Sequence, residues 1–355
     1  MRSLIDILDL SVEEINELIA AAMDIIQTPA KYSDACRGKQ LAALFLEPST
    51  RTRLSFESAM LALGGQVLSV TGAGTSSMSK GESISDTVKT VSCYADIIAM
   101  RHPQDGAALV AARSAGVPVI NAGDGGHCHP TQTLADLLTI YREKGRFSHL
   151  TVGVCGDLKY GRTVHSLIAA LSRYEGVRFV LISPAALRVP DYVTAAMQGK
   201  GIPFRETASL EEALPELDIL YMTRIQRERF FDPALYEALK DSYILDAEKM
   251  KLAKSDMCVL HPLPRVNEIS VAVDSDPRAC YFKQMFNGKM MRMALILKLL
   301  NDPSAPAPLP PLYHHLRCPN PRCVCQTEQE LPPSFVRVPG EGEAYRCLYC
   351  ETLAQ

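Results

Sequence analysis

The feature that most constrains the fold is segment 40–63, in which a strand pattern passes directly into a helix pattern. Residues 40–46 form a largely apolar run that is typical of a buried strand. A helical repeat of apolar residues follows and ends at Gly64 and Gly65; its members are Leu54, Phe56, Ala59, Met60 and Leu63. The residues between, 47–53, read Glu-Pro-Ser-Thr-Arg-Thr-Arg. The pattern therefore places Ser49 to Thr52 at the N-terminus of a helix.

A helix N-terminus preceded by a strand is suited to hold an anion. Unpaired backbone N–H groups and the positive end of the helix dipole converge there. Arg51 and Arg53 can add charge-assisted hydrogen bonds to a phosphate. Taken alone, the same residues would favour an ordinary capped helix with solvated arginines.

Short apolar runs alternate with helical stretches along most of the chain, which predicts parallel sheets. The first series has runs at 40–46, 67–70, 97–100 and 117–120, and the second has runs at 151–155, 179–182, 219–222 and 259–260. We therefore expect an α/β fold of two doubly wound parallel-sheet domains joined by helices, with a small C-terminal module. The predicted boundaries are 1–135, completed by a helix at about 286–302, then 136–285, a proline-rich linker 303–311 and a module 312–355.

Composition excludes several classes of protein. The 355 residues carry a formal charge of −3 and no block of Lys and Arg, so no electrostatic footprint for nucleic acid is present. No apolar run approaches the ~18 residues of a membrane span, and the first ten residues are unlike a signal peptide. We therefore expect a cytoplasmic protein with neither a nucleic-acid nor a membrane partner.

Six motifs in one order resemble those of the catalytic chain of aspartate carbamoyltransferase, over about residues 1–303. Besides residues 47–53, they are Ser-Lys-Gly-Glu at 79–82, His-Pro-Thr-Gln at 129–132, Asp-Leu-Lys-Tyr-Gly-Arg at 157–162, Thr-Arg-Ile-Gln at 223–226 and His-Pro-Leu-Pro-Arg at 261–265. That family transfers the carbamoyl group of carbamoyl phosphate to L-aspartate, giving N-carbamoyl-L-aspartate and phosphate in de novo pyrimidine synthesis.

The resemblance implies roles for individual residues on the carbamoyl phosphate side. The phosphate would be held by Ser49, Thr50, Arg51 and Thr52. The carbonyl oxygen, which gains charge in the tetrahedral intermediate, would face Arg101, His129 and Thr52, and Gln132 would bind the carbamoyl amine. For His129 the alternatives are a structural histidine or, with His127 and Asp124, a metal ligand. No catalytic metal or cofactor is expected.

The second substrate is a dicarboxylate, so the other domain needs cationic partners. By resemblance these are Arg162 and Arg224, together with Gln226 and the segment Leu263-Pro264. Ornithine carbamoyltransferase is an alternative, but that family uses a His-Cys-Leu-Pro motif, where this chain has His-Pro-Leu-Pro at 261–264. A non-catalytic scaffold with the same fold is a further alternative.

Segment 71–82 is rich in Gly and Ser, so we expect a mobile loop that closes over ligand. In the family the matching loop comes from a neighbouring subunit of a trimer. The resemblance thus implies a homotrimer in which Ser76 and Lys80 complete the active site of the adjacent chain. The alternative is a solvated surface loop.

Five of the eleven cysteines lie in the last 38 residues. Cys318 and Cys323 form one pair, Cys347 and Cys350 form another, and this spacing suits a structural, four-thiolate zinc site with Cys325 as a non-ligand. Two disulfides are the alternative, which a cytoplasmic chain disfavours. The tail resembles the zinc domain of the aspartate carbamoyltransferase regulatory chain, which links trimers in that family. The resemblance therefore implies a dimer of trimers as one form of assembly. Because no nucleotide-binding domain precedes it, we expect no control of this chain by nucleotides.

Overall fold

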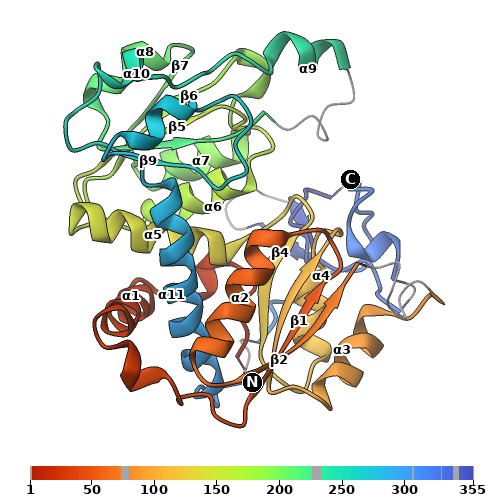
Figure 1. Cartoon of the computed structure of the whole chain (residues 1–355). Coiled ribbons are helices and arrows are strands. Elements are labelled where there is room, and N and C mark those ends of the chain that lie inside the picture. Colours follow the sequence, from red (N-terminus) through yellow and green to blue (C-terminus); the bar gives the residue numbers. More distant parts are fainter. Residues whose placement is uncertain are drawn as a thin grey trace. The chain divides into compact units, whose positions relative to one another are not determined.

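The computed structural model describes residues 2–72, 80–225, 233–305, 308–328, 330–338 and 344–354, and the chain folds as two units (Figure 1). Unit 1 comprises Met1–Thr131 together with Lys289–Gln355, and unit 2 comprises Gln132–Gly288. Both boundaries fall inside helices, namely α5 (Pro130–Lys144) and α11 (Tyr281–Leu300). Each unit is built around its own parallel sheet, which confirms the predicted α/β class.

The sheet of unit 1 has four parallel strands in the order β2-β1-β3-β4. The strands are β1 (Gln40–Phe45), β2 (Gln66–Thr71), β3 (Ile97–His102) and β4 (Val119–Asp124). The helices between them are α2 (Thr50–Ala62), α3 (Ile84–Ser92) and α4 (Ala107–Ser114). Because parallel strands end at the same edge of a sheet, the loops after β1, β3 and β4 lie together.

The sequence Ser-Val-Glu-Glu at 11–14 predicts a capping box and an amphipathic helix after it, and α1 (Val12–Gln27) forms there. The predicted apolar face ends at Ile26, whereas the structure buries Ile25 in its place. Ser11 Oγ accepts a hydrogen bond from the Glu14 backbone N–H, and the Glu14 carboxylate accepts one from the Ser11 N–H, which is a complete capping box. The buried face of the helix consists of Ile15, Leu18, Ile19, Ala22 and Ile25. This apolar stripe anchors the start of the chain in unit 1.

The sheet of unit 2 has five parallel strands in the order β7-β6-β5-β8-β9. They are β5 (Thr151–Cys155), β6 (Arg178–Ile182), β7 (Phe204–Thr207), β8 (Ile219–Met222) and β9 (Cys258–Leu260). The accompanying helices are α6 (Arg162–Leu171), α7 (Asp191–Gly199), α8 (Leu210–Ala213), α9 (Pro233–Leu239) and α10 (Ala247–Met250). Edge strand β7 has no predicted counterpart.

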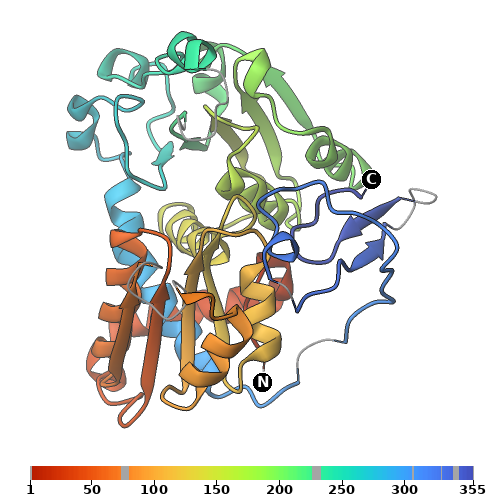
Figure 2. The same ribbon diagram turned by 90° about the vertical axis from the view of Figure 1, so that its right-hand side faces the viewer.

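The C-terminal tail, drawn in dark blue in Figure 2, is part of unit 1. It contains a two-stranded antiparallel ribbon of β10 (Phe335–Arg337) and β11 (Tyr345–Cys347). Its buried side chains, Val324, Phe335 and Tyr349 among them, share one hydrophobic core with residues of α3, α4 and β3. The tail is therefore packed on the sheet domain of its own chain.

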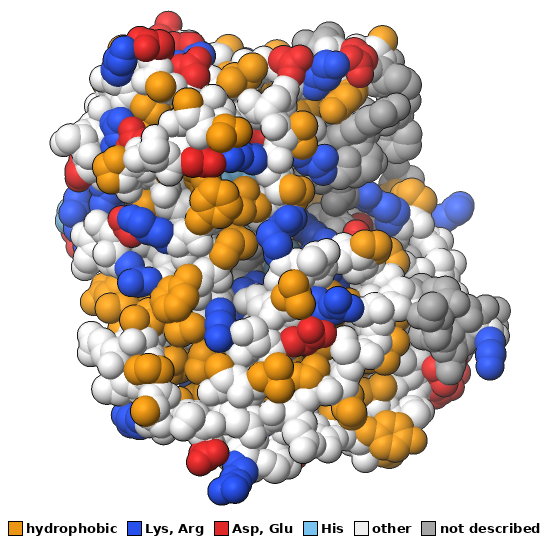
Figure 3. All heavy atoms as spheres, viewed as in Figure 1, with side chains coloured by type: hydrophobic (Ala, Val, Ile, Leu, Met, Phe, Trp, Pro, Cys, Tyr) orange, Lys and Arg blue, Asp and Glu red, His pale blue; other side chains and the backbone are white. Residues whose placement is uncertain are grey.

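No single charge dominates the face of the protein shown in Figure 3. Basic and acidic side chains are interspersed over the face in Figure 3, in keeping with the formal charge of −3. Within the described ranges, no helix is both long and apolar enough to cross a membrane.

Candidate active site and metal centre

The N-terminus of α2 follows β1 as the sequence predicts. Ser49 is the N-cap residue, and its hydroxyl makes no capping hydrogen bond. The helix begins at Thr50, which is exposed, and Thr52, two residues further on, is buried. The backbone N–H groups of the first turn therefore stand at the carboxyl edge of the sheet, where an anion is stabilised by the helix dipole.

Arg51 and Arg101 place two positive charges at this edge. Partial burial and the nearby charge of Arg101 lower the pKa of the Arg51 guanidinium. The Arg101 Nε atom, at the end of β3, donates to Glu47 Oε2 over 2.9 Å. Within the described residues no carboxylate pairs with Arg51, whereas the Nε atom of Arg53 lies 3.7 Å from Glu57 Oε1. The two arginines of the motif thus differ: Arg51 is poised for an anion, and Arg53 has an intrahelical partner.

His129 lies at the end of the loop after β4, immediately before α5, and is buried. Its Nδ1 atom is 3.5 Å from Thr131 Oγ1. Arg292 of α11, which the sequence patterns did not single out, lies close by: one Nη atom donates to Ser55 Oγ over 3.0 Å, and the other is 3.5 Å from Thr131 Oγ1. Its guanidinium also lies 5.1 Å from the centre of the Phe56 ring. Arg292 thereby links α2 to the start of α5.

A metal site at His127 and His129 has no support in the structure. The described part of the chain contains one group of side chains arranged for a metal, and it lies in the tail. His127 Nδ1 lies 3.1 Å from Asp124 Oδ2, but within the described residues His129 does not join these two in a group of three donors.

Unit 2 repeats the arrangement at the carboxyl ends of three neighbouring strands. Arg162 is the first residue of α6, after β5, Arg224 follows β8, and the segment Leu263-Pro264 follows β9. The Leu263-Pro264 peptide bond is cis. Gln132, which clusters with unit 2, donates from Nε2 to Asp136 Oδ1 over 2.7 Å. That bond fixes the amide and leaves its carbonyl oxygen as the end that can accept from a carbamoyl N–H.

A buried pair that the sequence analysis missed organises the loop after β9. His261 Nε2 is 2.7 Å from Glu268 Oε1, and His261 Nδ1 accepts from the Leu263 backbone N–H at 2.8 Å. Burial acts to raise the pKa of Glu268, but hydrogen bonding and the charge of His261 outweigh it and lower that pKa. The pair fixes the backbone that presents Leu263.

Of the remaining predicted site residues, one is described by the structure and two are not. Lys80 is exposed, in a short turn just before α3. Ser76 and Gln226 lie outside the described residues.

Five thiols cluster in the tail. The Sγ atoms of Cys318, Cys323, Cys325 and Cys347 all lie within 4.8 Å of one another, and Cys350 Sγ is 3.5 Å from Cys318 Sγ. All eleven cysteines are free thiols, so the disulfide alternative is not what the tail adopts. Hydrogen bonds from Cys323 and Cys347 lower the pKa of the Cys350 thiol, which favours a thiolate at that position. Buried, mutually close sulfur donors fit a tetrahedral metal ion. The proximity of Cys325 was not expected.

Comparisons with known proteins agree with this arrangement. Residues 2–142 match the aspartate/ornithine carbamoyltransferase carbamoyl-P binding domain, and residues 148–299 match the Asp/Orn binding domain of the same family. Residues 311–355 match the metal binding domain of the aspartate carbamoyltransferase regulatory chain.

Individual relatives give the same picture. The aspartate carbamoyltransferase catalytic subunit of Clostridium novyi is 62% identical over 299 residues, covering 84% of this chain and 98% of the relative. That of Finegoldia magna is 60% identical, with the same coverage.

Two solved structures share the fold. The catalytic subunit of M. jannaschii aspartate transcarbamoylase superposes with a TM-score of 0.80 at 48% identity, over 85% of this chain and 99% of that one. The Trypanosoma cruzi enzyme in complex with N-(phosphonacetyl)-L-aspartic acid gives a TM-score of 0.79 at 40% identity, over 84% and 95% of the two chains. This chain therefore belongs to the aspartate carbamoyltransferase family and carries, at its C-terminus, a domain of the regulatory-chain metal-binding family.

Proposed function

We propose that the chain transfers the carbamoyl group of carbamoyl phosphate to L-aspartate, releasing phosphate and N-carbamoyl-L-aspartate for pyrimidine synthesis. The observation that carries this proposal is the pair Arg51 and Arg101 beside the open N-terminus of α2. Two guanidinium groups and a helix dipole at one sheet edge match a phosphate dianion.

The chemistry follows from how these groups meet the substrate. Ser49, Thr50, Arg51 and Thr52 would hold the phosphate. Arg101, His129 and Thr52 would face the carbonyl oxygen and stabilise the negative charge that develops as the amine attacks. Correct placement of the two reactants can supply up to ~7–11 kcal/mol of the barrier reduction.

Aspartate would bind through unit 2. Arg162 and Arg224 are the cations for its two carboxylates, and Gln226 with Leu263-Pro264 would complete the pocket. On this assignment residues 1–135, with about 286–302, form the carbamoyl phosphate domain, and residues 136–285 form the aspartate domain. The similar proteins are named aspartate carbamoyltransferase catalytic subunits, so their names do not favour the ornithine or scaffold alternative.

The assay that tests this function is ureido-product formation by the purified chain. Carbamoyl phosphate is supplied with L-aspartate or L-ornithine, each with and without nucleotides. We expect product with aspartate alone and no response to CTP or ATP. Product with ornithine, or with neither amine in the assembled protein, would contradict the proposal.

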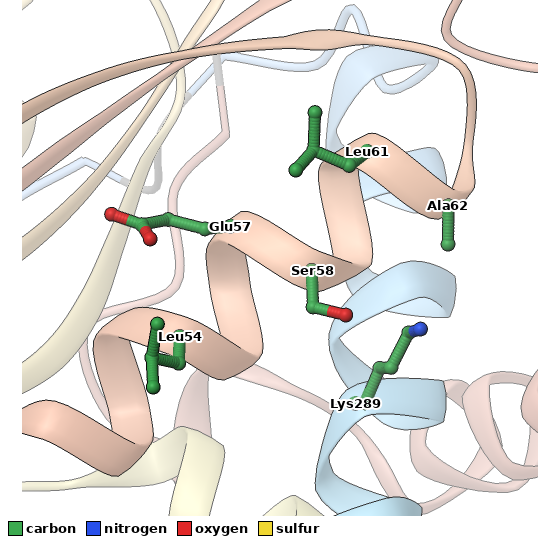
Figure 4. Close-up of a pocket in the computed structure, with 6 residues that line it drawn as sticks. All are labelled: Leu54, Glu57, Ser58, Leu61, Ala62 and Lys289. Carbon is green, nitrogen blue, oxygen red and sulfur yellow. The ribbon is translucent and has the colours of Figure 1, made fainter.

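We further propose that the active unit is a homotrimer in which Ser76 and Lys80 act in the neighbouring site. The exposed face of α2 supports a subunit contact: Leu54 and Leu61 are 51% and 60% exposed. They line an open hollow of about 450 Å³ with Glu57, Ser58 and Ala62 of α2 and Lys289 of α11 (Figure 4). Apolar side chains in such a position are typical of an interface.

A complementation experiment tests the shared site. The Lys80→Ala and Arg51→Ala variants should each be inactive alone. Co-assembled, they should regain part of the activity, because some sites then combine an intact Lys80 with an intact Arg51. Absence of recovery in mixed oligomers verified by mass spectrometry would rule out sharing.

The third proposal is that the tail, residues 312–355 after the spacer 303–311, holds structural zinc through Cys318, Cys323, Cys347 and Cys350. Its reduced thiols fit a cytoplasmic location. We expect about one zinc ion per chain, retained by Cys325→Ser and lost by Cys350→Ser. Zinc loss in Cys325→Ser but not in Cys350→Ser would show that Cys325, and not Cys350, is the fourth ligand.

By resemblance, the tail would also stabilise the assembly, and a dimer of trimers is one form it could take. A chain ending before Pro303 should then assemble less completely and unfold at lower temperature. Unchanged assembly and unchanged heat stability would contradict that role.

A further inference from the structure

The tail contacts the turn between β3 and α4 through Asp105, a buried residue. The Asp105 backbone N–H donates to Arg322 O, and the Val324 N–H donates to Asp105 O, each over 3.0 Å. Asn320 Nδ2, which lies between the first two cysteines of the tail, donates to Asp105 Oδ2 over 2.8 Å. The tail thus forms hydrogen bonds with the backbone of Asp105 and with one of its carboxylate oxygens.

The other oxygen of the same carboxylate holds the loop that leads to His129. Asp105 Oδ1 accepts from the Gly126 backbone N–H at 2.6 Å. The approach is so close that a Cβ atom on Gly125, whose φ is +49°, would lie 1.9 Å from that oxygen. The loop 125–128 therefore rests directly on a side chain whose position the tail sets.

A second path runs through His127. Its Nδ1 atom is 3.1 Å from Asp124 Oδ2, and its Nε2 atom is 3.4 Å from Glu351 Oε2 of the tail. The fully buried Asp124 also accepts from the Cys128 N–H over 3.0 Å and from the Gly106 N–H over 2.9 Å. His127 therefore bridges the tail and the buried carboxylate that fixes the other end of the loop.

The backbone of Glu351 is set by the turn after the last cysteine. Its φ of +58° is a left-handed conformation that residues with a side chain rarely adopt. A rare conformation of this kind persists where the surrounding structure imposes it. The direction in which Glu351 leaves the chain is consequently coupled to the fold of the thiol cluster.

We propose that Glu351 and Asn320 are positioning residues for catalysis: through His127 and Asp105 the tail holds the loop 125–128, and with it His129, in the geometry that the reaction needs. This inference rests on the proposed role of His129. It extends that role by assigning the fused tail a direct part in each chain's own active site, in addition to any part in assembly.

Docking of the tail is separable from this effect. The tail is held mainly by the shared apolar core, which includes Val324 and Phe335, whereas the Glu351 side chain is 63% exposed. Glu328 provides a matched control: it too is a tail glutamate contacting unit 1, but its Oε2 accepts from the Ile84 N–H at the start of α3 and not from the loop 125–128. Removing either carboxylate should leave the apolar contact in place.

The experiment uses the full chain with metal bound and compares Glu351→Ala, Glu351→Gln and Glu328→Ala. Hydrogen exchange is followed at the Gly126 and Cys128 amides, together with kcat, KM for both substrates and metal content. We expect Glu351→Ala to speed exchange of both amides and to lower kcat by about tenfold, with KM changed by less than about twofold. The contact between His127 and Glu351 is an ion pair in which His127 Nε2 makes no hydrogen bond to any described residue, so Glu351→Gln, which keeps the length of the side chain but removes its charge, should behave like Glu351→Ala. Glu328→Ala should alter neither value.

A second variant, placed in the loop, shows whether an effect of Glu351→Ala comes from the lost contact or from a disturbed fold of the tail. His127→Ala removes the same bridge without touching the tail, and the double variant with Glu351→Ala should lose no more than either single variant. The inference is overturned if Glu351→Ala leaves loop exchange and kcat unchanged, or if Glu328→Ala reduces them equally. Failure of the wild-type chain to form any ureido product would instead refute the proposed function, and loop exchange would still decide whether the tail orders the loop.

Discussion

Replacing Arg51 by alanine separates catalysis from folding. The Arg51 side chain has no ion partner within the described residues, and both its burial and the charge of Arg101 lower its pKa. Removing it relieves a repulsion and breaks no hydrogen bond with any residue that the structure describes. We therefore expect the free energy of unfolding to change by no more than about 0.5 kcal/mol.

The effect on activity should be much larger. A hydrogen bond to a charged group is worth ~1.5–3 kcal/mol, and losing one preorganised donor to the developing negative charge costs about 10²–10³ in rate. We expect kcat/KM for carbamoyl phosphate to fall by at least about a hundredfold, which corresponds to ~2.7 kcal/mol. Inorganic phosphate at about 100 times its Kd should stabilise the wild-type chain by ~2.7 kcal/mol and the variant far less.

Arg53 is the matched control for this measurement. It belongs to the same helix turn but pairs with Glu57 on the helix surface, so Arg53→Ala should change stability by less than about 1 kcal/mol. Steady-state kinetics and denaturant unfolding, with and without phosphate, give the four quantities needed. Equal losses of activity and stability in Arg51→Ala would refute the reasoning and make Arg51 a structural arginine.

Three further outcomes follow from burial, packing and the thiol cluster. Burial lowers the pKa of His102 from 6.5 to about 4. Between these two pKa values the unfolded chain binds a proton that the folded chain does not, so the free energy of unfolding should fall as the pH decreases. Urea unfolding should show a fall up to ~3 kcal/mol larger in the wild-type chain than in His102→Gln, and parallel pH profiles of the two would contradict this. Gly106 has a φ of +87°, and a Cβ added there would meet the Tyr349 carbonyl oxygen at 2.5 Å. Gly106→Ala should therefore weaken docking of the tail by ~2–5 kcal/mol, which faster proteolysis after the spacer would detect. Unchanged proteolysis would show that the backbone can shift to accept the methyl group. Removing the metal with a chelator should make the tail thiols reactive to alkylation while those of unit 2 stay protected, and equal reactivity before and after would argue against a metal centre.

The elements that sequence patterns predicted are those whose signal is local. The run before α2, the N-cap at Ser49 and the capping box at Ser11 each depend on a few neighbouring residues. The residues of each strand likewise stand out where both faces of the strand are buried, as in β1 and β5.

What the patterns missed depends on partners distant in the sequence. Strand β7 reads Phe-Arg-Glu-Thr, an edge strand without an apolar run, so only its pairing with β6 defines it. The sequence pattern did not predict the start of α11, because Gln284 and Asn287 are polar yet fully buried and so do not continue the apolar repeat. Gln284 Nε2 donates to Asp136 Oδ1 over 2.7 Å and Asn287 Nδ2 to Thr139 Oγ1 over 2.9 Å, pairings that no helical repeat announces.

The candidate site follows the same division. The family resemblance selected Arg51, Arg101 and His129. The residues that position them were not foreseeable, because Arg292, Asp105 and Glu351 act through contacts with elements far away in the chain.

The two sheets explain how motifs scattered over some two hundred residues can serve one reaction. In unit 1 the side chains proposed to bind the phosphate and the carbonyl oxygen follow β1, β3 and β4, and in unit 2 the side chains proposed to bind aspartate follow β5, β8 and β9. Sequence order does not give sheet order, but parallel pairing sends every one of these loops to the carboxyl edge of its sheet, whichever strands are neighbours. Motif positions at strand ends therefore predict which side chains can meet. The tail adds one element that this rule does not contain: through Asp105 and His127 it holds the loop after β4 from outside the sheet, so its loss should disturb His129 while leaving the N-terminus of α2 intact.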